Sequence, residues 1–280
     1  MTSRRLLKSL PVAPLLILLV FVVASLGADL FAPHDPRQQN ILINLAPPNW
    51  LPGGEEDHLL GTDNLGRDIL SNILYGGRVS LAVGFFALLI SAAIGIPLGL
   101  VAGYFGGRAG SLIMRLADAQ LALPTILVAL VVLALLGAGL DRVILVIGVV
   151  GWAIYARITR AAVIQVRERD FVSAAQALGT STPRILAKHI LPNALSPILV
   201  QLSVDFPRVV LLEATLSFLG LGVSVDTPSL GLMVAAGQNH LFSGVWWLSA
   251  FPGLALTFLV LSVNLLGDWV RDVFDPRLRL

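Results

Sequence analysis

Three ionisable residues interrupt a long apolar stretch in the second half of the chain. Asp205, Arg208 and Glu213 lie between Ala194 and Gly222. A charge at the centre of a membrane helix costs about 2.5–3.5 kcal/mol on insertion scales, and such residues rarely face lipid. Asp205 and Arg208 are close enough in sequence to pair along one helix face. Two interpretations stay open: a structural ion pair toward the protein interior, or the polar wall of a translocation path.

The residue types that usually form catalytic or metal sites do not occur at the spacings that such sites require. The chain has no Cys, which excludes thiolate sites and Cys-ligated metals. His34, His58 and His240 lie in predicted outer segments and His189 in an inner one, and none has metal-ligand spacing, although spacing leaves open whether the outer histidines meet in space. A G-x-S-x-G elbow, the mark of one class of serine hydrolase, is absent as well. We therefore predict no catalytic residue and no metal site.

A nucleotide-binding loop is also absent from the sequence. The phosphate-binding motif G-x-x-x-x-G-K-S/T requires a Lys that directly follows a Gly. The two lysines are Lys8, which follows Leu7, and Lys188, which follows Ala187. We therefore expect this chain to bind no cofactor, and any ATP-driven step to need a separate polypeptide.

The chain that carries these residues is mostly apolar. Of its 280 residues, 56% are hydrophobic and 13% are charged, whereas soluble domains carry about 25% charged residues. Its formal net charge of +2 gives no reason to expect a nucleic-acid partner. The predicted fold class is an all-α integral membrane protein of about six transmembrane helices, at Pro11 to Ala28, Val79 to Gly107, Leu121 to Leu140, Val143 to Ala156 with a continuation toward Ile164, Ala194 to Gly222, and Leu248 to Gly267.

The distribution of basic residues predicts the orientation, because cytoplasmic segments are enriched in Lys and Arg. With the N-terminus inside, only Arg37, Arg67, Arg78 and Arg142 fall in outer segments. The first apolar run also resembles a secretory signal, an alternative that N-terminal sequencing would decide. Both termini are predicted to be cytoplasmic, since most of the 19 basic residues then lie inside: Arg4, Arg5, Lys8, Arg108, Arg115, Arg157, Arg160, Arg167, Arg169, Arg184, Lys188, Arg271, Arg277 and Arg279.

The chain divides into three parts. Residues 1–32 form the cytoplasmic N-terminus and first helix, residues 33–78 an outer segment, and residues 79–280 a core of five helices. On the second predicted span, glycines recur at every fourth position, which puts them on one helix face and lets another backbone approach closely. These glycines are Gly95, Gly99, Gly103 and Gly107. The favoured interpretation is that they pack within this chain, and the alternative is that they form a seam with a second membrane subunit.

The longest cytoplasmic loop, residues 157–193 within that core, predicts a helix-turn-helix. Its first helix covers Arg167 to Leu178 and its second Pro183 to about Ile190. Glycine commonly follows a helix end, and Ser, Thr and Pro commonly begin one. A proline disfavours helix in the residue before it. The stop and start signals are Gly179, Thr182, Pro183 and Pro192.

The same loop carries a recognisable motif. The run from Asp170 to Gly179, followed by His189 to Asn193, resembles the signature loop of binding-protein-dependent ABC import permeases. That motif has Glu-Ala-Ala, three residues, Gly, nine residues, Ile, one residue and Leu-Pro. Ser173 replaces the Glu and His189 the Ile. The resemblance implies that the loop docks in a groove of an ATP-binding subunit, through Asp170, Ser173, Ala174, Ala175, Gly179, Leu191 and Pro192.

Residues 58–280 are similar to the dipeptide, oligopeptide and nickel permease group, and most of all to its second, C-type subunit. Glu213 corresponds to the family's Glu before a Leu-Ser-Phe-Leu-Gly run. The other similar segments are His58 to Asp68, Ala102 to Gly107, Leu123-Pro124, Leu216 to Gly222, Phe251 to Gly253, Gly267 to Asp272, and Asp275 to Arg277.

This resemblance implies a multi-pass permease in the cytoplasmic membrane of a bacterium or archaeon, surrounded by lipid and importing di- or oligopeptides. It further implies a second permease subunit, two ATP-binding subunits that use ATP and Mg, and an extracytoplasmic solute-binding protein. Nickel, glutathione or another small solute is an alternative cargo for the same assembly. A stand-alone secondary transporter is an alternative of another class, although the inverted repeats common in such proteins are not visible.

Overall fold

The computed structural model describes residues 11–224 and 226–274. Within these residues the chain is helical and has no strand, apart from one isolated bridge between Thr62 and Asp68. The elements are α2 Val12–Leu26, α3 Ala28–Phe31, η1 Ile41–Ile43, α4 Ile69–Tyr104, α5 Gly107–Leu121, α6 Thr125–Leu136, α7 Leu140–Val150, α8 Trp152–Arg167, α9 Asp170–Ala177, α10 Thr182–Ile185, η2 Leu186–Ile190, α11 Leu191–Phe218, α12 Leu230–Gln238, η3 Leu241–Ser243 and α13 Trp247–Phe274.

Four helical stretches are long and apolar enough to cross a membrane: α4, α7 with α8, the run from Thr182 to Phe218, and α13. The pair α5 and α6 passes the same test together but is bent by 84°. The shorter apolar helix α2 has 15 residues. This arrangement agrees with the predicted all-helical membrane protein of about six helices.

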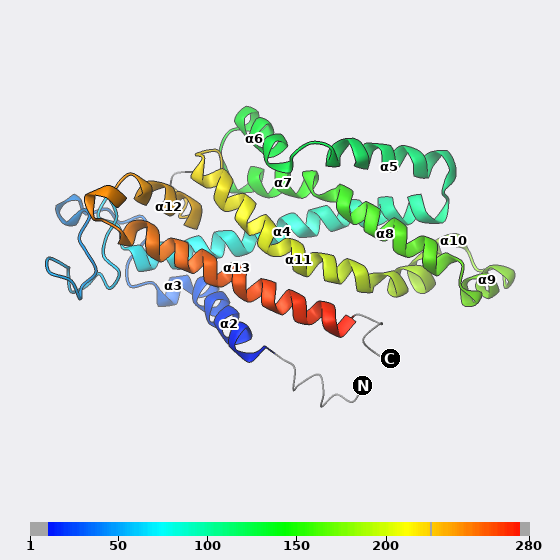
Figure 1. The fold of residues 1–280 in the computed structure, drawn as a ribbon, viewed down its shortest axis with the longest axis horizontal. Coiled ribbons are helices and arrows are strands. Elements are labelled where there is room, and N and C mark those ends of the chain that lie inside the picture. Colours follow the sequence, from blue (N-terminus) through cyan, green and yellow to red (C-terminus); the bar gives the residue numbers. More distant parts are fainter. Residues whose placement is uncertain (1–10, 225, 275–280) are drawn as a thin grey trace.

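The prediction for the third span was wrong. Within the predicted Leu121 to Leu140 only the shorter helix α6, Thr125–Leu136, is formed, and α5 ends where the predicted span begins. The break falls at Pro124, which lacks a backbone N–H and disfavours helix in the residue before it. The amphipathic helix α5, absent from the prediction, therefore runs along the bundle before the chain turns into α6 (Figure 1).

Two other elements differ from the predicted spans. α4 begins at Ile69, well before the predicted Val79, because Asp68 caps it by accepting a hydrogen bond from the backbone N–H of Ser71 at 2.7 Å. The helix α12 was not predicted, and it packs on both α11 and α13. Gly231 of α12 lies directly against the backbone of α11, so that the two helices approach closely.

The most extensive contact between two helices of the described residues is that of α4 with α8. Gly95, Gly99 and Gly103 face α8, where an added Cβ at each would meet atoms of α8 at less than 3.0 Å. These three glycines therefore pack within this chain. Gly107 does not share their face, because α4 ends at Tyr104 and Gly107 already begins α5 with a φ of +55°.

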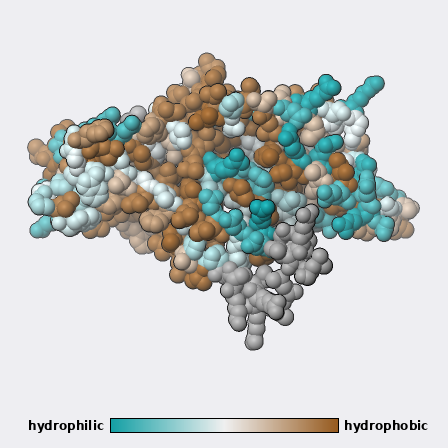
Figure 2. Space-filling view, viewed as in Figure 1, coloured by the Kyte–Doolittle hydropathy of each residue, from teal (hydrophilic) through white to brown (hydrophobic). Residues whose placement is uncertain are grey.

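The segments assigned to the two sides of the membrane lie at opposite ends of the bundle. The connection between α3 and α4 lies at one end, and α9 and α10 lie at the other (Figure 1). Hydrophobic residues dominate the middle of the visible face, and hydrophilic ones gather mainly toward the α9 end (Figure 2). The basic residues at positions 4, 5, 8, 277 and 279 lie outside the described residues.

Candidate functional site

The loop between α8 and α11 is a small packed unit at one end of the bundle. Val172 and Ala175 on one side of α9 are buried, together with Ile185 and Ile190, against the end of α8. Two contacts tie the unit to the end of α4, since Arg167 donates to the Tyr104 carbonyl at 2.7 Å and Gln176 to the Tyr104 hydroxyl at 3.2 Å. These contacts therefore fix the position of the loop relative to the bundle.

The opposite side of α9 is exposed and partly apolar. Phe171 is 42% exposed and Leu178 is 85% exposed. Ser173 and Ala174 lie on this open side with Asp170 in the first turn, whereas Ala175 faces inward. A partner that covered this side of α9 would remove the apolar surface of Leu178 from water, which is favourable in proportion to the area buried.

The turn after α9 follows the sequence prediction. Gly179 has a φ of +72°, and its N–H donates to the Gln176 carbonyl at 2.9 Å, while the N–H of Thr180 donates to the Ala175 carbonyl at 3.0 Å. This left-handed residue ends the helix because glycine adopts positive φ without steric cost. An added Cβ at Gly179 would meet no atom within 4 Å, so its surroundings are open.

Three details of the predicted helix-turn-helix were wrong. The first helix does not begin at Arg167, because α8 continues to that residue and α9 starts at Asp170. The residue that caps the second helix is Ser181, with no side-chain capping bond, and Thr182 is already helical.

The third error concerns Pro192, which does not end a helix. It lies in the first turn of α11, directly after the π-helical turn η2. A proline ring would strike the carbonyl four residues earlier in a regular α-helix, here that of Lys188, and the wider π turn relieves this clash. The described helix therefore runs without interruption from Thr182 to Phe218.

The ionisable residues of α11 occupy two different environments. Asp205 is 8% exposed and accepts hydrogen bonds from the Tyr155 hydroxyl at 3.0 Å and from Arg208 at 3.4 Å. The Arg208 side chain itself is 74% exposed. The carboxylate thus stays bound inside the chain by α8, while the guanidinium extends from the surface of the bundle.

Glu213 is fully buried in a cluster of hydroxyl groups. Its carboxyl accepts from Ser217 at 2.8 Å, Ser229 at 2.9 Å and Ser80 at 3.2 Å. These donors come from α11, the residue before α12, and α4, so the carboxyl joins three elements. Glu213 is recognisable from the sequence as a charge in an apolar stretch, whereas the three serines are not, because single serines in apolar helices give no signal of a shared partner.

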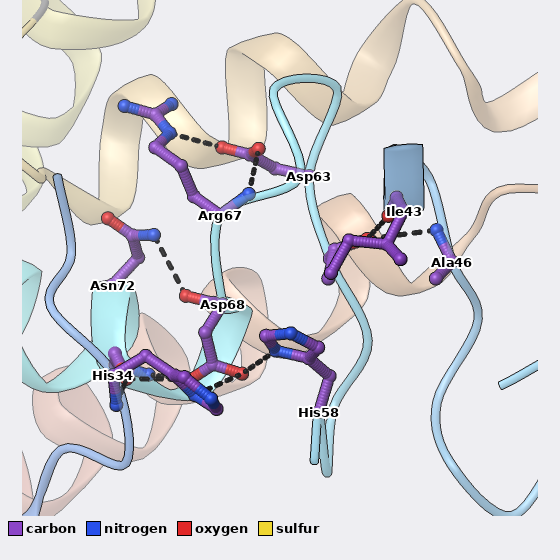
Figure 3. A network of polar contacts seen from close by, with 10 residues as sticks. His34, Ile43, Ala46, His58, Asp63, Arg67, Asp68 and Asn72 are labelled. Atoms are coloured by element: carbon purple, nitrogen blue, oxygen red, sulfur yellow. Dashed lines mark hydrogen bonds and ion pairs between the residues drawn. The ribbon is translucent and has the colours of Figure 1, made fainter. Parts of the chain in front are cut away.

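The outer connection between α3 and α4 is held by short polar contacts. Asp63 accepts from the Arg67 Nε at 2.7 Å, and the second oxygen of Asp68 accepts from Ser71 (Figure 3). Nearby, Arg78 donates to Asp29 at 2.9 Å, which lowers the pKa of that carboxyl below its usual range. These contacts fix the approach of the chain to α4.

The bundle and its loop define a class of protein: a multi-pass helical membrane subunit that presents a helix-turn-helix at one end. Residues 95–280 match the family described as binding-protein-dependent transport system inner membrane component. The chain belongs to this family, and it is a multi-pass protein of the inner membrane.

Named relatives cover nearly the whole chain. The di/tripeptide transport system permease protein DppC of Pseudomonas aeruginosa is 44% identical over 265 residues, 95% of this chain and 87% of the relative. The dipeptide transport system permease protein DppC of Haemophilus influenzae is 42% identical over 95% of this chain and 90% of the relative. A solved structure of the MetNI methionine ABC transporter, inward facing, has a TM-score of 0.59 at 18% identity, over 73% of this chain and 96% of that chain, and shows the shared fold.

Proposed function

We propose that this chain is the C-type permease subunit of an ATP-driven importer of di- or oligopeptides. In this assembly a second permease completes the pathway, two ATP-binding subunits hydrolyse ATP with Mg, and an extracytoplasmic protein delivers the solute. The family and the named peptide permeases support this proposal.

The observation that carries the proposal is the exposed face of α9. Its apolar tip has no packing role within the described residues, since Leu178 is 85% exposed while Val172 and Ala175 on the other side are buried. An ATP-binding subunit that covers this face would bury the leucine. Complete burial of a leucine contributes about 1.5–3 kcal/mol, or roughly 10- to 100-fold in affinity.

The test is co-purification of ATP-binding subunits with the C-terminally tagged chain from mild-detergent membranes of its native host. We expect Leu178→Asp to reduce the recovered ATPase at least tenfold. The matched control is Phe242→Asp, which also places an acid on a bare apolar side chain but at the opposite end of the molecule, where Phe242 is 103% exposed. It should leave recovery unchanged.

Two results would contradict the proposal. Equal ATPase recovery with Leu178→Asp and Phe242→Asp would remove the α9 face from the interface. Recovery of the wild-type chain without any nucleotide-binding protein would make the stand-alone secondary transporter the better explanation.

The cargo is tested separately, by uptake in cells that lack this chain. Loss of labelled dipeptide uptake, with nickel and glutathione uptake intact, is expected. Loss of nickel or glutathione uptake alone would assign the assembly to that alternative cargo while leaving the permease role in place.

A further inference from the structure

Three potential metal ligands meet at the outer end of α4, although they are distant in the sequence. The Nδ1 atom of His58 lies 3.0 Å from the Oδ1 atom of Asp68, and the Nδ1 atom of His34 lies 4.0 Å from the same oxygen (Figure 3). The two imidazole rings are stacked, with centroids 4.4 Å apart and planes inclined by 27°. All three ligand atoms lie within 4.8 Å of one another.

One of these atoms has no partner. The Nδ1 atom of His34 is buried and makes no hydrogen bond with any described residue. Leaving a buried polar atom unsatisfied costs about 1–3 kcal/mol. This nitrogen faces the Oδ1 atom of Asp68 at 4.0 Å, too far for a hydrogen bond, and an ion between the two atoms would give it a partner.

The surroundings suit a cation. Asp68 is 2% exposed, and its second oxygen is fixed by the N–H and the hydroxyl of Ser71, both at 2.7 Å. Such outer contacts orient a ligating carboxylate. The cluster opens to a pocket of about 280 Å³ whose lining also contains Glu55 and Asp57, which add negative charge.

We propose that His34, His58 and Asp68 bind one divalent transition-metal ion, Zn²⁺ above all. Two imidazole nitrogens and one carboxylate oxygen are a common zinc ligand set, and the pocket leaves a fourth position for water. At metal–ligand distances of about 2.0–2.2 Å the ligand atoms of a tetrahedral site are about 3.4 Å apart. Binding therefore requires the His34 ring to turn and move toward Asp68, now 4.0 Å away, until the three ligand atoms, now within 4.8 Å of one another, have drawn together.

The site revises the expectation of no metal, which was drawn from sequence spacing alone. It would join three parts of the outer region: the segment after α3 through His34, the loop before α4 through His58, and the first turn of α4 through its capping residue Asp68. The inference depends on this geometry and not on the transported solute.

The experiment titrates the purified, EDTA-stripped full chain in detergent with Zn²⁺ against a chromophoric chelator, with metal content determined by mass spectrometry. We expect one ion per chain. His34→Phe keeps a ring against His58 but removes the nitrogen, and Asp68→Asn keeps an acceptor at the cap but removes the charge. Each should weaken binding about tenfold or more. His240→Phe, an outer histidine outside the cluster, should bind like the wild type.

Absence of saturable Zn²⁺ binding to the wild-type chain in the micromolar range would overturn the proposal. So would wild-type affinity in both His34→Phe and Asp68→Asn, or an equal loss in His240→Phe. Helix content and elution volume are measured for every variant, and the wild-type stoichiometry stands as a test that needs no variant to fold.

Discussion

Replacing Gly99 by Ala tests the packing of α4 on α8 with a single methyl group. The added Cβ would lie 2.6 Å from the carbonyl oxygen of Ala156 and 2.6 Å from the Cβ of Thr159. Both distances are below any normal carbon contact, and one partner is backbone, which has no rotamer with which to withdraw. The two helices therefore have to separate along their tightest contact.

The sign of the effect depends on two opposing terms. Alanine in a helix interior is favoured over glycine by about 1 kcal/mol. Overpacking a close contact costs about 1–3 kcal/mol, and the two short contacts at this position place Gly99→Ala at the upper end of that range. The net expected destabilisation is about 2 kcal/mol, or a fall of roughly 4–8 °C in the unfolding temperature of the full chain in detergent.

Gly253→Ala is the matched control for this prediction. Gly253 lies within α13, and an added Cβ there would meet no atom within 4 Å. Only the helix-propensity term remains, so this variant should unfold at or above the wild-type temperature. If Gly99→Ala is as stable as Gly253→Ala in the isolated chain but no longer holds the second permease, Gly99 belongs to an intersubunit seam and the packing argument fails.

Two further predictions concern the ionisable residues of α11. Glu213→Ala leaves three buried hydroxyl groups without their acceptor and should destabilise the chain by about 2–4 kcal/mol. Glu213→Gln keeps an acceptor oxygen and should cost less than about 1 kcal/mol. Equal losses of stability for the two variants in thermal unfolding would show that the charge itself is required. Arg208→Ala removes an exposed partner while Tyr155 still binds Asp205, so stability should change by no more than about 0.5 kcal/mol. Uptake should nevertheless fall if Arg208 contacts the solute path, and failure of assembly instead would make the pair structural.

The sequence was most informative where one local signal is sufficient. Gly179 ends α9 because a single left-handed residue is enough to do so, and nothing distant has to agree. The long apolar runs likewise predict membrane helices from composition alone. The exposed tip of the loop was not predicted, since the motif named Ala175, which is buried, and not Leu178, which is 85% exposed.

The sequence was least informative where contacts join segments that are distant along the chain. His34 and His58 are 4.4 Å apart between ring centroids, yet no spacing rule connects them across the intervening loop. The hydroxyl cluster around Glu213 likewise includes Ser80, which lies 133 residues earlier in the chain. Such sites depend on how helices pack, and packing is decided by the whole bundle.

The uninterrupted helix at Pro192 affects how the loop can move as a unit. A short helix bounded by glycine and proline would be a lever hinged at both ends. In the described residues the second helix of the loop is bounded on its Gly179 side alone, since the π turn lets the helix pass Pro192 and continue to Phe218. One continuous helix thus joins Thr182 to Asp205 and Glu213, whereas the exposed face of α9 lies before Gly179 and is not part of that helix. In the proposed assembly, a displacement of α9 would first reach the second helix of the loop, through the Gly179 turn and through the packing of Val172 and Ala175 with Ile185 and Ile190. From Thr182 onward the displacement would pass along the axis of one helix to the buried carboxyls, so α11 is the element that we expect to carry it into the transmembrane core.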